Sequence, residues 1–147
     1  MSLKVYIASP WLNRTEAAAA QEKFEAAGFE VTAHWIHHHS DAVMGDPKDD
    51  QELQQQAIED VEDIIKSDVF VILNLDLSEG KATEFGMAYG LGIPVILVGE
   101  RTRNIFYYLP AVFRAESVEE AIEGILEAEK VWAAQIDATV KEGEVMN

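Results

Sequence analysis

Short apolar runs alternate along this chain with longer segments whose apolar residues recur every three or four positions. The runs that predict strands are residues 4–8 (KVYIA), 29–34 (FEVTAH), 68–76 (DVFVILNLD), 93–99 (IPVILVG) and 111–115 (AVFRA). The third run is apolar almost throughout, which indicates a strand buried on both faces at the centre of a parallel sheet. Strands that alternate with helices in this way predict an α/β fold with a five-stranded, mainly parallel sheet.

The first helix is predicted directly after the first strand. Asn13 and Glu16 have the spacing of a capping box, and the helix should run to about Ala27 with Gly28 at its C-terminal cap.

Three further helices are predicted by the pattern. The second begins near Asp49, the third covers residues 78–92 and the last opens at Ser117. The apolar stripe of the second helix consists of Ala57, Ile58, Val61, Ile64 and Ile65. From Glu116 onward nine acidic residues stand against two basic ones, which predicts a solvated face on the last helix.

No internal repeat, low-complexity tract or linker interrupts this order, so we expect a single domain over residues 1–147. In open parallel sheets, ligands bind beyond the carboxyl ends of the strands, at the point where the strand order reverses. That rule points to the loops after Ala8, His34, Asp76 and Val98.

The charge balance narrows the class of ligand. The chain has 27 acidic and 11 basic residues, a net charge of −16. Such a surface repels nucleic-acid polymers and anionic membranes, although a local pocket can still accept a small nucleotide. The chain has no cysteine, and its start (MSLKVYIASP) lacks the features of a signal peptide, so we expect a cytoplasmic protein.

All four histidines fall within residues 34–39, close to Asp41. On a strand, neighbouring side chains alternate between faces, so only His37 and His39 can share a face, with Asp41 or His34 as a third metal ligand. There is no HExxH motif and no second Cys/His group, so the spacing does not favour a metal. The alternatives are hydrogen bonding to a ligand and packing of the loop.

The third helix contains the most informative segment. Ala82, Gly86 and Gly90 recur every four residues and predict a smooth face that lies close to the sheet. The pattern puts Glu84 in the first turn, where the helix dipole stabilises an anion by about 0.3–1 kcal/mol. A carboxylate held there is a candidate nucleophile or base. The alternative is a glutamate that only favours the helix start.

The ordered set VYIASPW, DVFVILNLD and TEFGMAYGLGIPVILV resembles the nucleoside 2-deoxyribosyltransferase family, whose relatives include deoxynucleoside monophosphate N-glycosidases. The resemblance covers the first strand and residues 60–98, with a weaker tail to Ala115. It implies a flavodoxin-like, Rossmann-like three-layer sandwich. It also implies cleavage or transfer of N-glycosidic bonds, without a metal or other cofactor.

The same resemblance assigns three catalytic residues: Glu84 as the catalytic glutamate, Asp60 as its acidic partner and Tyr6 as the first-strand tyrosine. A retaining transfer needs a carboxylate nucleophile, which Glu84 can supply, and a proton for the departing base. Asp60 can deliver that proton if burial raises its pKa, although position alone does not separate it from its acidic neighbours. Tyr6 can hold Glu84 by a hydrogen bond or pack in the core.

The loops supply the candidate substrate-binding residues Ser9, Trp11, Asn13, Arg14, His34, Asp76, Gly80 and Asn104. Trp11 can stack on a nucleobase or belong to the core, and Arg14 can meet a 5′-phosphate or lie on the surface. Residues 104–106 (NIF) match, with phenylalanine in place of methionine, the family's asparagine motif that a neighbouring subunit donates. This implies a homo-oligomer whose sites are completed between subunits.

The sequence thus predicts an enzyme that transfers 2-deoxyribose between nucleobases through a covalent intermediate on Glu84. Its partners would be a small nucleoside or nucleotide and a free nucleobase. One alternative is a hydrolase of 2′-deoxynucleoside 5′-monophosphates. Another is a nucleotide-sensing module without catalysis, because a fold alone does not give a function.

Overall fold

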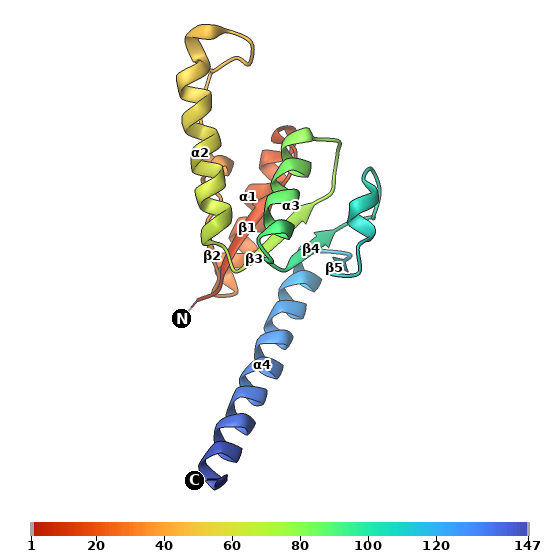
Figure 1. The fold of residues 1–147 in the computed structure, drawn as a ribbon. Helices are drawn as coiled ribbons and strands as arrows, with labels where there is room; N and C mark the ends of the chain where they lie inside the picture. Colours follow the sequence, from red (N-terminus) through yellow and green to blue (C-terminus); the bar gives the residue numbers. More distant parts are fainter. Residues whose placement is uncertain (1, 147) are drawn as a thin grey trace.

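The computed structural model describes residues 2–146 and gathers the strands into one sheet. The strands are β1 (Lys4–Ala8), β2 (Glu30–Val31), β3 (Val69–Leu73), β4 (Val95–Val98) and β5 (Val112–Ala115). Their order is β2-β1-β3-β4-β5, and every neighbouring pair is parallel (Figure 1). The predicted α/β class is confirmed, with a sheet that is parallel throughout.

Four α-helices accompany the sheet: α1 (Arg14–Ala26), α2 (Asp50–Lys66), α3 (Glu79–Gly90) and α4 (Val118–Met146). The first turns of α4 contact α1, whereas α2 contacts α3. The sheet lies between these two pairs, which gives the three-layer sandwich implied by the resemblance.

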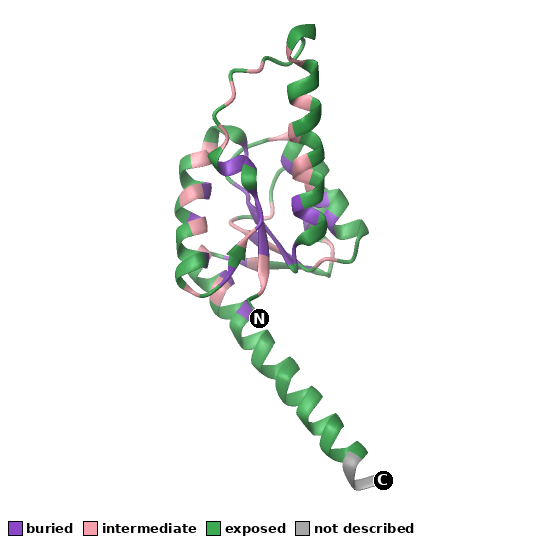
Figure 2. Cartoon of the chain, turned by 90° about the vertical axis from the view of Figure 1, so that its left-hand side faces the viewer, coloured by how far each residue is buried: buried purple, intermediate pink, exposed green. Residues whose placement is uncertain are grey.

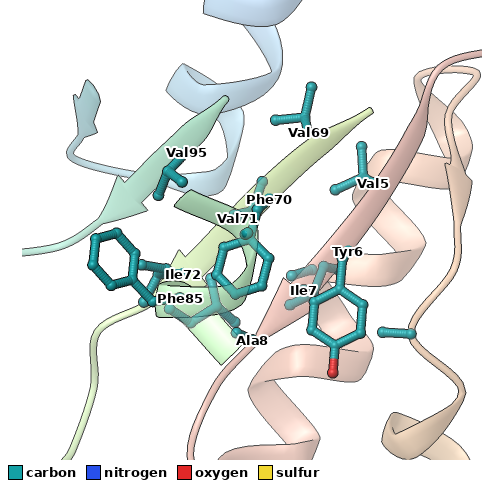
Figure 3. Close-up of a cluster of buried hydrophobic side chains, with 14 of the residues drawn as sticks. Val5, Tyr6, Ile7, Ala8, Val69, Phe70, Val71, Ile72, Phe85 and Val95 are labelled. Atoms are coloured by element: carbon teal, nitrogen blue, oxygen red, sulfur yellow. The ribbon is translucent and has the colours of Figure 1, made fainter. Parts of the chain in front are cut away.

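The two central strands form the core. All five residues of β3 are buried, as the continuous apolar run predicts. The rings of Tyr6 on β1 and Phe70 on β3 stack with centroids 5.4 Å apart, and Phe85 of α3 packs nearby (Figure 3).

The register of β1 and β3 positions the functional edge. Val5 pairs with Val69 and Ala8 with Ile72, so both strands end side by side. The chain leaves β1 towards β2 on one side, and β3 leads to β4 on the other. This is the reversal point at which the open-sheet rule places a ligand.

Two local predictions on the first half of the chain are wrong. The second strand covers only Glu30–Val31, because the chain then turns into a 3-10 helix, η2 (His34–His37), whose Trp35 side chain is buried and donates Nε1–H to the Ile7 carbonyl at 2.9 Å. Asn13 makes no capping hydrogen bond, since another 3-10 turn, η1 (Trp11–Asn13), leads directly into α1. Gly28 follows α1 with φ +96°, as expected beyond a helix end.

The predicted faces of α2 and α3 are also wrong. Gly86 and Gly90 are exposed, and the face of α3 that meets the body of the protein carries Lys81, Phe85 and Ala88. Large side chains fill the space beside the sheet, so the small residues are turned outward. On α2, Ile64 is buried, whereas Ile58, Val61 and Ile65 are exposed.

Helix α4 begins as predicted, with the Glu120 N–H donating to Ser117 Oγ at 3.1 Å. Its first turns pack through Ala121 and Ile125, and the helix then leaves the body of the protein (Figures 1 and 2). Two more 3-10 turns, η3 (Pro47–Asp49) and η4 (Ile105–Tyr108), lie in loops. Among residues 2–146, none of the helices combines the length and the apolar character needed to cross a bilayer.

Candidate active site

A cavity of about 460 Å³ opens at the carboxyl edge of the sheet. Its volume suits a small ligand. The lining residues come from the loop after β1, from the segment that includes η2 and the loop after it, from one side of α2 and from the start of α3. They are Ser9, Trp11, Trp35, His38, Ser40, Ala42, Met44, Leu53, Gln56, Asp60, Ser78, Gly80, Lys81 and Glu84.

Glu84 lies in the second turn of α3, one turn later than predicted. Its pKa is raised to about 8, and burial is the main cause. A contact with Tyr6 offsets part of this rise, and the charge of Asp60 contributes to it. Such a rise corresponds to several kcal/mol against the anion, which exceeds any helix-dipole stabilisation. The expectation that the helix start stabilises the Glu84 anion is therefore wrong, and the free protein holds this group mostly neutral at pH 7.

Tyr6 lies beneath the cavity and is completely buried. Its ring packs on Phe70, and burial, followed by the charge of Glu84, raises its pKa, so the phenol stays protonated. The Tyr6 hydroxyl and Glu84 Oε2 are both buried, and neither makes a well-formed hydrogen bond to any residue in the range 2–146. Tyr6 is thus a core aromatic whose hydroxyl is directed towards the candidate nucleophile.

Asp60 projects from α2 into the same cavity. Its pKa is raised to about 6, mainly by burial; nearby His38 offsets part of the rise, and the charges of Asp63 and Glu59 add to it. Its Oδ1 atom is buried and has no hydrogen-bond partner in the described part of the chain. Position on the helix did not distinguish Asp60, but the structure does, because it alone among the acids of α2 lines the cavity beside Glu84.

The neighbouring acids of α2 have other partners. Asp63 is buried and accepts from the His34 N–H at 3.1 Å, with His34 Nδ1 2.9 Å from the same carboxylate oxygen. This hydrogen bond is the main cause that raises the pKa of His34. Glu59 Oε1 lies 2.6 Å from His38 Nε2. His34 is therefore fixed to α2 outside the cavity lining, and His38 takes the place at the cavity that was predicted for His34.

The metal grouping considered for the histidine segment does not form among residues 2–146. His37 Nε2 lies 2.8 Å from Gln21 Oε1, away from the other histidines. The potential ligand atoms that do gather, within 4.8 Å of one another, belong to His34, Glu59 and Asp63. Residues His34–His37 form the η2 turn and not an extended strand. His37 and His39 therefore do not share the strand face on which the possible metal site depended.

The loop after β1 forms one wall of the cavity. Ser9 and Trp11 line it, and the Trp11 side chain remains half-exposed. Arg14 lies over the Trp11 ring at 4.1 Å and donates to the His38 carbonyl at 3.1 Å. Arg14 thus supports the wall from behind. Asn13 does not line the cavity either, and its Oδ1 is buried without a partner within the described residues.

The opposite wall depends on Lys81, which sequence reasoning missed. This side chain is only 3% exposed, and its Nζ donates to Asn74 Oδ1 at 2.8 Å and to the Asp76 carbonyl at 2.7 Å. Burial, together with nearby Arg103, lowers the pKa of Lys81 to about 8. Gly80 lines the cavity as predicted, whereas Asp76 does not; its carbonyl accepts from Lys81 Nζ, and its charge offsets part of the fall in the Lys81 pKa. The available signal was the spacing, since Lys81 stands three residues before Glu84 on one side of the helix.

Asn104 lies outside this cavity. Its side chain caps η4 by accepting from the Phe106 N–H at 3.0 Å. Ile105, Phe106 and Tyr108 are exposed beside it, while Tyr107 is buried. The prediction that Asn104 serves a neighbouring subunit stays a prediction.

Comparison with known proteins gives one family. The model described as nucleoside 2-deoxyribosyltransferase matches residues 5–143. No curated protein matches the sequence.

Several solved structures share the fold. A conserved protein from Enterococcus faecalis V583 has a TM-score of 0.61 at 18% identity, covering 87% of this chain and 99% of that one. A 2-deoxyribosyltransferase from Bacillus psychrosaccharolyticus has 0.57 at 20% identity, covering 81% and 90%. A CMP N-glycosidase from Clostridium botulinum has 0.54 at 18% identity, covering 83% and 97%. At these identities the likeness shows the fold alone.

Proposed function

The chain belongs to the nucleoside 2-deoxyribosyltransferase family, and from this premise we propose that it transfers 2-deoxyribose between nucleobases. The substrate would be a 2′-deoxynucleoside, and the bond cleaved would be its N-glycosidic bond. The observation that carries this proposal is that Glu84 and Asp60 line one cavity and that Tyr6 is buried against Glu84, each of the three side chains having a buried oxygen without a partner among residues 2–146.

The proposed reaction has two half-reactions. In the first, the Glu84 carboxylate attacks the anomeric carbon as the bond to the base breaks, and Asp60 protonates the departing base. This leaves a deoxyribosyl ester on Glu84 and an ionised Asp60. In the second, a new base attacks the anomeric carbon and gives its proton to Asp60, which releases Glu84 as a carboxylate. Tyr6 would donate to Glu84 and orient it. Trp11, at the cavity wall, offers a ring on which a nucleobase can stack.

A second candidate is hydrolysis of 2′-deoxynucleoside 5′-monophosphates, with water as the acceptor. The supporting observation is that Arg14, Lys81 and Arg103 form no ion pair with a carboxylate in the described part of the chain. Lys81 lines the cavity, and Arg103 is close enough to affect its pKa. Unpaired cations beside a site in a chain of net charge −16 favour an anionic substrate. A nucleotide-sensing role without catalysis is the remaining alternative.

We also propose that a neighbouring subunit completes the site through Asn104. Supporting this, the asparagine is held at the tip of a loop by η4, beside the exposed side chains of Ile105 and Phe106. Aromatic side chains exposed in this way are typical of interfaces.

The test is incubation with deoxynucleosides and their 5′-monophosphates, with and without a second free base, followed by chromatography of the products. Base exchange that requires the added base indicates the transferase, whereas free deoxyribose or its phosphate indicates the hydrolase. Glu84→Ala should lower the rate at least about 10³-fold, because it removes the nucleophile. Glu79→Ala, an exposed acid on the same helix, is the matched control and should be neutral. The proposal fails if no substrate is cleaved, or if Glu84→Ala retains the wild-type rate.

A further inference from the structure

The outer part of helix α4 extends far from the body of the protein (Figures 1 and 2). After Ile125, every residue up to Gly143 is exposed. At 1.5 Å per residue this segment extends about 27 Å. Tertiary packing supplies most of the stability of helices in proteins, and this segment has none within residues 2–146. The geometry of α4 therefore calls for a packing partner.

The exposed part of α4 has a defined apolar face. At 100° per residue, Leu126, Trp132, Ala133, Ile136 and Val140 lie within about one third of the circumference. Trp132 is 66% exposed, Val140 55% and Ile136 47%. The acids and lysines of this segment lie mostly on the remaining surface. Glu129 is the exception, since it falls in the middle of the apolar face.

An apolar groove of about 610 Å³ lies beside the same helix. It runs between α4 and the amino-end edge of the sheet, and its lining includes Pro94, Ile96, Phe113, Ile125 and Trp132. Phe113 is 61% exposed, because α4 leaves the sheet before it covers β5 completely. The groove lies at the edge of the sheet opposite Glu84, so a partner bound in it is independent of the proposed function.

We propose that α4 and this groove form a twofold interface between two copies of the chain, in which the outer half of each α4 lies antiparallel in the groove of the other copy. The partner is a second copy of the chain because α4 carries both the apolar face and one wall of the groove, so each copy offers a helix to the groove of the other. A twofold axis crossing α4 between Trp132 and Ile136 covers both surfaces on both copies at once. Val140 of the second copy then lies beside Ala128 and Gly124, whose small side chains leave room for it.

The size and composition of these surfaces suit such an interface. Trp132 and Phe113 each leave about 100–150 Å² of ring exposed, judging from full aromatic areas of roughly 150–250 Å². With Ile136 and Val140 added, two copies cover on the order of 1,000 Å², the lower bound for a specific interface. Depletion of charge at the centre is typical of interface cores. Glu129 opposes association, as does the charge of −16 on each copy.

Sedimentation velocity of the full chain over a concentration series tests the proposal. The key variant is Ile136→Glu combined with Val140→Glu, which we expect to raise the dimer Kd at least about 100-fold. The matched control, Ala134→Glu with Ala138→Glu, adds the same charge on the opposite side of the helix and should change Kd less than about fivefold. Both pairs lie on exposed positions, so circular dichroism should show an unchanged fold.

Two further changes should lower the dimer Kd, which the Ile136→Glu, Val140→Glu pair raises. Glu129→Leu should lower the Kd at least about tenfold, because it removes the one charge from the apolar face. Added salt should also tighten the dimer by screening repulsion between the copies. A wild-type chain that stays monomeric at 100 μM would overturn the proposal, and so would a variant with Ile136→Glu and Val140→Glu whose assembly has the same mass and the same Kd as wild type. Equal loss of the dimer in both glutamate pairs would overturn it as well.

A cross-link tests the antiparallel arrangement, because the chain has no cysteine of its own. Ala133→Cys puts the only thiol on the apolar face near the axis, and a short bis-maleimide should join two copies. Ala138→Cys, on the far side of the helix, should remain uncoupled. Cross-linking that is equal at both positions would contradict the arrangement.

Discussion

Glu84 and Asp60 rest in protonation states opposite to those that the proposed reaction uses. The pKa of Glu84 is raised to about 8 and that of Asp60 to about 6, mainly by burial. At pH 7 the free protein therefore holds mostly neutral Glu84 and ionised Asp60. The form with an ionised Glu84 and a protonated Asp60 makes up on the order of 1% of the molecules. That population is greatest at pH 7 and falls on both sides, which predicts a bell-shaped profile of kcat/KM.

Asp60→Asn should change the shape of that profile as well as its height. Loss of the proton donor should lower kcat/KM by about 10²–10⁴-fold at pH 7. The alkaline fall should disappear, because no group then has to hold a proton, and activity should rise with pH through the Glu84 pKa of about 8 or slightly below. Initial rates from pH 5 to 9.5 measure this, with Glu62→Gln on the same helix as the control. A profile for Asp60→Asn that still falls above pH 8 would remove Asp60 from the role of proton donor.

Glu84→Gln should stabilise the fold while abolishing activity. A carboxyl group whose pKa rises on folding binds more protons in the native state, so its contribution to stability is lost as pH increases from about 4.5 to about 8. The amide does not ionise. The free energy of unfolding of Glu84→Gln should thus exceed that of wild type by a few kcal/mol at pH 8 and match it near pH 4.5. Urea unfolding at the two pH values measures the difference. Exposed Glu79→Gln should show none, and an equal effect at both pH values would contradict the assignment.

At the scale of elements, the turn between β3 and α3 depends on a polar network that no apolar pattern shows. Lys81 joins the start of α3 to Asn74, and Asn74 Nδ2 in turn donates to the Glu100 carbonyl at 2.6 Å. The sequence predicts the strand and the helix on either side correctly. It does not reveal Lys81, because lysine is seldom buried and its acceptors stand seven and five residues earlier.

Lys81→Met should destabilise the protein by about 1–3 kcal/mol. Methionine fills a similar space but leaves Asn74 Oδ1 and the Asp76 carbonyl without their donor, and buried acceptors left unpaired are costly. The urea midpoint measures the loss. Thr83→Ala is the matched control two residues along the helix, since its exposed hydroxyl bonds only within α3, and it should cost less than about 0.5 kcal/mol. A midpoint for Lys81→Met equal to that of wild type would show that the network does not hold the turn.

The predictions that failed on elements share a cause. Periodicity identified the apolar positions of α2 and the small positions of α3, but it does not tell which side of a helix meets the sheet when both sides carry apolar residues. Ile64 is buried on α2 and Ile65 is not, and on α3 Phe85 faces the protein while Gly86 faces solvent. Tertiary packing decided these faces.

At the scale of the whole molecule, the parallel sheet and its order could be predicted from the sequence, because alternating strands and helices permit few topologies. The site could be predicted in part. Glu84, Asp60, Ser9, Trp11 and Gly80 line one cavity as the rule for open sheets and the family resemblance led us to expect.

Other site residues were beyond prediction because their positions depend on side-chain partners. Arg14 packs over the Trp11 ring, and His34 contacts the buried carboxylate of Asp63, so neither lines the cavity. His38, Gln56 and Leu53 line it instead, from a loop and a helix whose rotation the pattern left open.

The order β2-β1-β3-β4-β5 also has a consequence for how fast the chain reaches its native state. Every strand pair is parallel, so none can form as a local hairpin, and the central pairing of Val5 with Val69 closes a loop of more than sixty residues. Loop-closure entropy must be overcome before these contacts contribute, and folding rates fall as contacting residues lie further apart along the chain. We expect refolding to be slow for a chain of this length, with the early helices formed well before the sheet on which the active edge depends.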